Sequence, residues 1–136
     1  MTRWMLAAAL VTMSACAGGP PEPATVALGE DACAYCRMTI VSRATAAQIV
    51  RAGDEPVFFD EIGCLRDYLA RRAAPADAVV YVTDHRTGAW VEARTAVFTR
   101  TSTSTPMASG LLAHADAASR DADPAAAGGS QAAVIP

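Results

Sequence analysis

Three sulfur-bearing residues lie within six positions of one another near the start of the chain, in the order Cys33-x-x-Cys36-x-Met38. This order places two thiols and one thioether in a single short segment. Soft thiolate and thioether ligands select Cu(I), whereas imidazole suits zinc, and carboxylate suits magnesium or calcium. The spacing therefore predicts a cuprous site in this segment.

Other interpretations of the same cysteines stay open. In an exported protein, a Cys-x-x-Cys pair can close a small disulfide loop, and a thiol-disulfide oxidoreductase would cycle such a pair. Zinc can be bound by three cysteines and one histidine, although the spacings here match no common finger. Met38 favours copper because neither a disulfide nor a zinc site uses a thioether, but a methionine can also fill a gap in a core. The residues available for such a zinc site are Cys33, Cys36 and Cys64, with His85 or His114.

Length and composition limit the class of function. A chain of 136 residues is enough for one compact domain. Its 11 basic residues are outnumbered by 14 acidic ones, so a nucleic-acid partner is not expected. We find no phosphate-binding loop or Ser/His/Asp arrangement, and the adjacent Asp60 and Glu61 fit the start of a helix better than an acid/base pair. The composition favours a binding protein over an enzyme.

The first residues resemble a bacterial lipoprotein signal peptide. Arg3 precedes a short apolar run, and Ser14-Ala15-Cys16 resembles a lipobox, although Met13 stands where Leu is usual. We expect residues 1–15 to be removed and Cys16 to carry the lipid; a soluble secreted protein cleaved nearby is the alternative. Because Ala17 rather than Asp follows, we expect a periplasmic protein held at the outer membrane rather than the inner one.

Composition divides the rest of the chain into three parts. Residues 16–27 are rich in Gly and Pro and predict a flexible tether after the lipidated cysteine. Residues 28–120 predict the folded domain. Residues 121–136 are dominated by Ala, Gly, Asp and Pro and predict a disordered tail.

Hydrophobic periodicity predicts two successive strand-strand-helix units, and hence an α+β fold. Asp60 is the expected N-cap of the first helix, and Cys64 lies on its apolar stripe, so we expect Cys64 to be a buried small side chain. His85 lies in a polar turn and is expected to be exposed. The expected strands span residues 45–51, 56–59, 78–83, 89–92 and 96–99, and the expected helices span residues 60–72 and 111–119.

Four segments together resemble the NosL family of copper-binding lipoproteins, which are accessory to nitrous oxide reductase. The resemblance implies a NosL/MerB-like fold of ββαβ type, without organomercurial lyase activity, because fold does not imply function. It implies Cys36 and Met38 as the primary Cu(I) ligands and Met107 as a third, with Cys33 as a further candidate. The four segments are Cys33-x-x-Cys36-x-Met38, Phe59 to Cys64, Val82 to Trp90, and Thr105 to Leu111.

The same resemblance implies a function. A monomeric copper chaperone of this family would deliver Cu(I) to apo nitrous oxide reductase, with help from the NosDFY membrane complex. Two positions depart from the family, which often has Gly where this chain has Arg37 and Ala108. Arg37 is expected to lower the pKa of the Cys36 thiol. His114 follows Met107 by seven residues, a helical spacing, but is expected at the surface and outside the ligand set.

Overall fold

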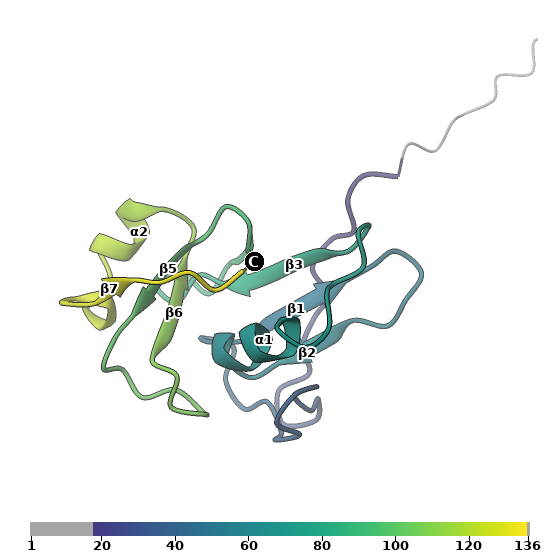
Figure 1. Cartoon of the computed structure of the whole chain (residues 1–136), viewed down its shortest axis with the longest axis horizontal. Helices are drawn as coiled ribbons and strands as arrows, with labels where there is room; N and C mark the ends of the chain where they lie inside the picture. The colour runs from purple at the N-terminus through teal and green to yellow at the C-terminus, as the bar shows by residue number, and fades with distance from the viewer. Residues whose placement is uncertain (1–17, 136) are drawn as a thin grey trace, which may run out of the picture.

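The computed structural model describes residues 18–135, so the predicted signal peptide and Cys16 lie outside it. The chain forms two small antiparallel sheets, each associated with one helix, and Figure 1 shows the two halves next to each other. This arrangement confirms the predicted α+β class. Among residues 18–135, no helix has both the length and the apolar character needed to cross a bilayer.

The first sheet has four strands in the order β2-β1-β3-β4, all antiparallel to their neighbours. Each strand lies within an expected range, because segments rich in β-branched and aromatic residues are bounded by turn residues. The chain then passes to the second sheet after β4. The strands are β1 (Ala47–Val50), β2 (Val57–Phe59), β3 (Val79–Thr83) and β4 (Trp90–Glu92).

Helix α1 (Ile62–Leu69) packs against the first sheet and buries Ile62, Leu65 and Leu69 in the common core. The helix begins two residues later than expected, with Glu61 as N-cap and without a side-chain capping bond. Asp60 is therefore not the N-cap, and its side chain is free to face another partner. Cys64 is buried on the apolar stripe, as predicted.

The second sheet has the order β6-β5-β7, with β5 (Val97–Arg100), β6 (Leu111–His114) and β7 (Ser130–Gln131). The helix expected over residues 111–119 is wrong for its first half, since residues 111–114 form a strand paired with β5. All four residues of β6 are buried, and a short apolar run of this kind fits a strand as well as a helix. Helix α2 (Ala117–Asp121) begins only after Asp116, whose side chain accepts a bond from the Ser119 amide.

The last residues are ordered, in contrast to the expected disordered tail. After the 3-10 helix η1 (Pro124–Ala126), β7 pairs with β5, with Gln131 opposite Thr99. Val134 is buried in the hydrophobic core. The sequence of this segment has no hydrophobic periodicity. Its backbone nevertheless forms hydrogen bonds with the free edge of β5, and its Val134 side chain enters the core. Pairing with a distant strand thus orders a segment that composition alone marks as flexible.

Part of the expected tether also lies against the domain. The Tyr81 hydroxyl donates to the Pro21 carbonyl at 2.7 Å, and Gln48 makes two bonds with the backbone of Ala24, at 2.8 and 3.0 Å. Val26 is buried in the core. The segment from Pro21 to Val26 is therefore docked on the first sheet instead of being free.

Candidate metal centre

The segment between Cys33 and Met38 forms a closed loop. The Cys33 amide donates to the Met38 carbonyl at 2.8 Å, and the Arg37 amide donates to the Cys33 carbonyl at 3.0 Å. To close this loop, Arg37 adopts φ 69°, a left-handed conformation that costs a non-glycine residue about 1–2 kcal/mol. Ala108 is the other non-glycine residue with positive φ in the described chain, at 58°. Arg37 and Ala108, where the resemblance implies glycine, are therefore positions at which the backbone favours glycine.

This loop brings Cys33 and Cys36 next to Cys64 on α1 and to Asp60, which precedes the helix. The ligand atoms of these four residues all lie within 4.8 Å of one another, and we call this group the thiol cluster. The Cys36 thiol donates to Asp60 Oδ2 at 3.5 Å, while Asp60 Oδ1 is buried and has no hydrogen-bond partner among residues 18–135. Cys33 and Cys64 are buried and Cys36 is partly exposed, and all three are free thiols. The cluster is a candidate metal centre reached through Cys36.

Burial favours the protonated form of the Cys36 and Cys64 thiols. Burial is the main cause that raises the pKa of Cys36, with smaller contributions from the Cys33 thiol and the Asp60 charge, while the Met38 amide acts in the opposite direction. Burial also raises the pKa of Cys64 far above its ordinary range, with help from Cys33 and Asp60. The expected lowering of the Cys36 pKa is not found: the pKa is raised, and the exposed Arg37 side chain is not among the groups that shift it. A metal ion must displace a proton to bind here.

The two predicted methionine ligands lie at the surface. Met38 is 47% exposed and Met107 is 48% exposed. The Met107 amide donates to Glu61 Oε2 at 3.1 Å, which places this residue beside the start of α1. Met107 and Cys64 line the same surface hollow. The structure thus places Met107 on the side of the domain that carries the thiol cluster.

Close packing at Gly63 positions the segment that carries Met107. A methyl group added at Gly63 would lie 2.6 Å from the Ser109 Cβ, closer than side-chain carbons approach in folded proteins. The absence of a side chain at Gly63 therefore allows the loop to approach the first turn of α1. The loop that carries Met107 therefore packs against the helix next to Cys64, which belongs to the thiol cluster.

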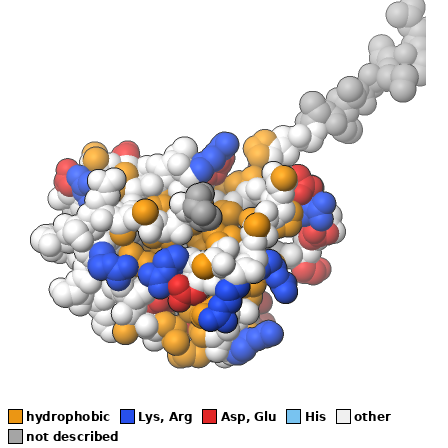
Figure 2. Space-filling view, viewed as in Figure 1, with side chains coloured by type: hydrophobic (Ala, Val, Ile, Leu, Met, Phe, Trp, Pro, Cys, Tyr) orange, Lys and Arg blue, Asp and Glu red, His pale blue; other side chains and the backbone are white. Residues whose placement is uncertain are grey.

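Large exposed hydrophobic side chains accompany the cluster. In residues 18–135 these are Leu28, Met38, Val41 and Met107. The Gly29 amide donates to the Ile40 carbonyl at 2.9 Å, which holds Leu28 and Val41 on the same folded loop as Met38. Figure 2 shows that arginine side chains gather among apolar ones on the face that carries α1.

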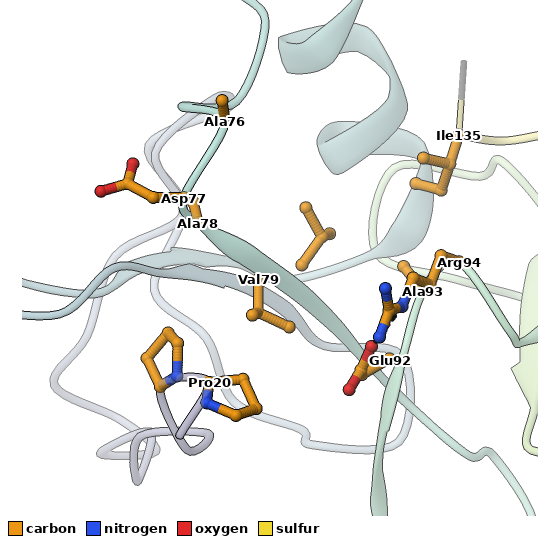
Figure 3. Close-up of a pocket in the computed structure, with 11 residues that line it drawn as sticks. Pro20, Ala76, Asp77, Ala78, Val79, Glu92, Ala93, Arg94 and Ile135 are labelled. Atoms are coloured by element: carbon orange, nitrogen blue, oxygen red, sulfur yellow. Dashed lines mark hydrogen bonds and ion pairs between the residues drawn. The ribbon is translucent and has the colours of Figure 1, made fainter. Parts of the chain in front are cut away.

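A larger hollow lies elsewhere and contains no sulfur ligand. Figure 3 shows it between Pro20, Val79, Glu92 and Ile135, at the edge where the docked segment meets β3 and β4. Its lining is mostly apolar and includes no cysteine, methionine or histidine. We therefore place the candidate metal centre at the thiol cluster.

The two histidines differ in how they meet expectation. His114 is fully buried, so the prediction that it lies at the surface is wrong, whereas His85 lies in the expected turn and its side chain is 20% exposed. Both histidines contact Asp123 instead of the thiol cluster. The fourth ligand group beside the three cysteines is the Asp60 carboxylate. The Cys₃His zinc set is therefore not assembled. No sequence signal marks His114 as buried, because its burial depends on the unexpected strand β6.

The fold and the thiol cluster together define a small α+β domain with a candidate site for a soft metal ion. The NosL family model matches residues 25–134, and the chain belongs to the NosL family. No curated protein and no solved structure matches the chain. The family resemblance inferred from the four motifs is thus confirmed over most of the chain.

Proposed function

We propose that this protein is a Cu(I) metallochaperone that supplies copper for assembly of the nitrous oxide reductase copper centre. One observation carries the proposal: three free thiols converge on a loop with one partly exposed member, Cys36, next to an exposed thioether, Met38. Sulfur ligands of these two kinds are those that select Cu(I). Membership of the NosL family supports a role connected with copper.

Cys36 would supply the thiolate that binds the ion. It is the partly exposed thiol of the cluster, whereas Cys33 and Cys64 lie behind it in the core. A second thiolate would add another negative charge to a buried site that already holds the Asp60 carboxylate, and burial penalises charge. We therefore assign Met38 and Met107 as the neutral sulfur ligands. Cys33 remains a further candidate ligand within the cluster.

The exposure of the ligands supports transfer by ligand exchange. Thioethers at the surface can be replaced one at a time by ligands from a recipient protein, so that the ion is never released. The exposed side chains of Leu28 and Val41 on the same loop would form the apolar part of a docking surface. The proposed recipient is apo nitrous oxide reductase, with the NosDFY complex as a further partner.

A lipid anchor at Cys16 would hold this monomeric domain at the periplasmic face of the cell envelope. The support for this part is the sequence resemblance of residues 1–16 to a lipoprotein signal. The docked segment from Pro21 to Val26 would leave only a few residues between the lipid and the domain. The site would therefore lie close to the membrane surface.

Competition with a chromogenic Cu(I) chelator tests the ligand assignment. Cys36→Ser is expected to weaken Cu(I) binding by at least about a hundredfold while the fold is kept, because the hydroxyl is a poor ligand for a soft ion. Met38→Ala should weaken Cu(I) binding but leave any Zn²⁺ binding unchanged. Val41→Ala is the matched control, since it alters the same exposed loop without removing sulfur. Wild-type affinity in Cys36→Ser would reject the assignment.

Transfer experiments separate the chaperone from a general copper buffer or a zinc-binding lipoprotein. The loaded protein is mixed with apo nitrous oxide reductase in the presence of excess chelator, and the visible spectrum of the reductase is followed. A chaperone loads the reductase under these conditions, while a buffer loses its copper to the chelator. A thiol oxidoreductase would instead show turnover of a Cys33–Cys36 disulfide with a dithiol substrate.

A further inference from the structure

A second group of potential metal ligands lies where the turn between β3 and β4 meets the second sheet. His85 comes from the turn between β3 and β4, His114 ends β6, and Asp123 lies between α2 and η1. Asp123 Oδ2 lies 2.6 Å from His85 Nδ1 and 2.9 Å from His114 Nε2. Three separate segments thus bring two imidazoles and one carboxylate oxygen to a single point, with their ligand atoms within 4.8 Å of one another.

The environment of His114 is unfavourable for a purely structural side chain. Its ring is completely buried, and its Nδ1 atom has no hydrogen-bond partner. A buried polar atom without a partner is costly, so an apolar side chain would fill this position in the core at lower cost. The polar contact that the ring makes within residues 18–135 is directed through Nε2 at Asp123. Nε2 is therefore the ring nitrogen that faces the other two potential ligands.

Contacts on both oxygens hold the Asp123 carboxylate in place. Its Oδ2 atom contacts both imidazole rings, those of His85 and His114. Its Oδ1 atom accepts the Ala125 amide at 2.9 Å, which fixes the carboxylate at the start of η1. Oδ2 is thereby left to face the two imidazoles.

A second carboxylate fixes the segments that carry these ligands. Asp84 Oδ2 accepts from the Ala115 amide and from the Ser119 hydroxyl, both at 2.7 Å. Its Oδ1 accepts from the Arg86 and Thr87 amides at 3.0 and 2.9 Å. Asp84 therefore joins the turn that carries His85 to the residues that follow His114. Such support keeps metal ligands in place.

We propose that His85, His114 and Asp123 form a second metal site, which binds a divalent ion of borderline softness such as Zn²⁺ or Cu²⁺. Imidazole and carboxylate suit these ions, whereas the thiol cluster suits Cu(I). The site is independent of the proposed chaperone function and shares no residue with the thiol cluster. It would give the domain two centres of different metal preference.

The geometry allows an ion to enter with small movements. Zinc binds nitrogen and oxygen at about 2.0–2.1 Å, so ligand atoms around it lie about 3.3 Å apart. The two short contacts of Asp123 would therefore open by less than about 1 Å as the ion replaces the shared protons. The His85 side chain is partly exposed, so its ring can adjust while the turn that carries it stays in place. Asp123 lines a surface hollow with Thr99 and Gln131, which gives access for the ion and for a water ligand.

Nuclear magnetic resonance of the imidazole nitrogens tests this site directly, because the chain has only two histidines. The full chain, labelled with ¹⁵N at histidine, is titrated with Zn²⁺. We expect the His85 Nδ1 and His114 Nε2 signals to shift together and to saturate with one ion. In a parallel experiment with Cu²⁺, electron paramagnetic resonance should show coupling to two nitrogens. If neither ion binds to the folded protein through these nitrogens, the proposal is wrong.

Three variants separate this site from others. Asp123→Asn keeps the Oδ1 atom that accepts the Ala125 amide but removes the charge, and should weaken binding by about a hundredfold or more. His85→Ala, at a partly exposed turn position, should abolish the response of the His114 ring with little effect on folding. Cys36→Ser is the matched control, and the response of both rings should persist in it. If the ring shifts survive in the folded Asp123→Asn and His85→Ala variants, the site does not exist as described.

Discussion

The pH dependence of Cu(I) affinity tests how many thiolates bind the ion. Burial raises the pKa of Cys36 above its ordinary value of 9.0. Cys36 is therefore protonated through the neutral range, and each thiol that becomes a ligand must release one proton. Below the thiol pKa, the affinity then rises about tenfold per pH unit for each thiolate bound.

With Cys36 as the single thiolate, the affinity should increase about a hundredfold between roughly pH 6 and pH 8. The sign follows from the raised pKa: binding is weakest at low pH, where protons compete with the ion, and it strengthens until the pH passes the pKa of Cys36. If Cys64 bound as a second thiolate, the increase would be about ten thousandfold. Burial keeps Cys64 protonated, which is the physical reason for expecting the smaller change.

The assay is competition with a Cu(I) chelator whose own pH dependence is known, under anaerobic conditions. Cys64→Ser is the matched control, because it removes a thiol of the cluster that we expect to stay protonated, and its slope should equal that of the wild type. A slope close to two in the wild type would refute the single-thiolate reasoning. A slope close to zero would refute Cys36 as a ligand altogether.

Four further predictions follow from the geometry. Hydrogen bonds outweigh burial and lower the pKa of Asp84 from 3.8 to about 2. This shift corresponds to about 2 kcal/mol of stability that is present above pH 3.8 and lost as the pH falls towards 2. Denaturant unfolding of Asp84→Asn at neutral pH should show a loss of that size. Ala108→Gly should raise the free energy of unfolding by about 1 kcal/mol, because Ala108 has φ 58°, which glycine adopts without strain. Ala118→Gly inside α2 should lower the free energy of unfolding by about 1 kcal/mol. Equal effects of the two changes would contradict this reasoning. Val134→Ala should lower the free energy of unfolding by about 1–2 kcal/mol, since the side chain is buried; no loss would mean that the last residues are not part of the core. Cys16→Ser should move the protein from the detergent phase to the aqueous phase, and retention in the detergent phase would count against the lipid anchor.

Local patterns in the sequence were sufficient for the first half of the domain. Strands β1 to β4 are short segments rich in β-branched and aromatic residues and are separated by turn residues, so their positions follow from residue type and turn chemistry. The motif from Cys33 to Met38 carries its chemistry in the residue types alone, because the soft ligands are adjacent along the chain. The glycine preference at position 37 was visible as a departure from the family, and the backbone explains it.

The second half depended on contacts between distant segments. Residues 111–114 are apolar enough for a helix or a strand, and pairing with β5 decides for the strand. The composition of residues 121–135 indicates disorder until β7 pairs with β5 and Val134 enters the core. Both outcomes depend on pairing with β5 and on space in the core for Val134, and no local pattern in the sequence predicts either one.

The sequence by itself determined the family, the α+β class and the candidate sulfur ligands closest to one another along the chain. Only the tertiary structure decided that Cys64 and Asp60 join Cys33 and Cys36, and that His85, His114 and Asp123 meet at one point. The physical reason is that residue types and short spacings act within a single element, whereas these clusters form where different elements pack together. The same packing sets the burial that raises the pKa of Cys36 and lets Asp123 face two imidazoles.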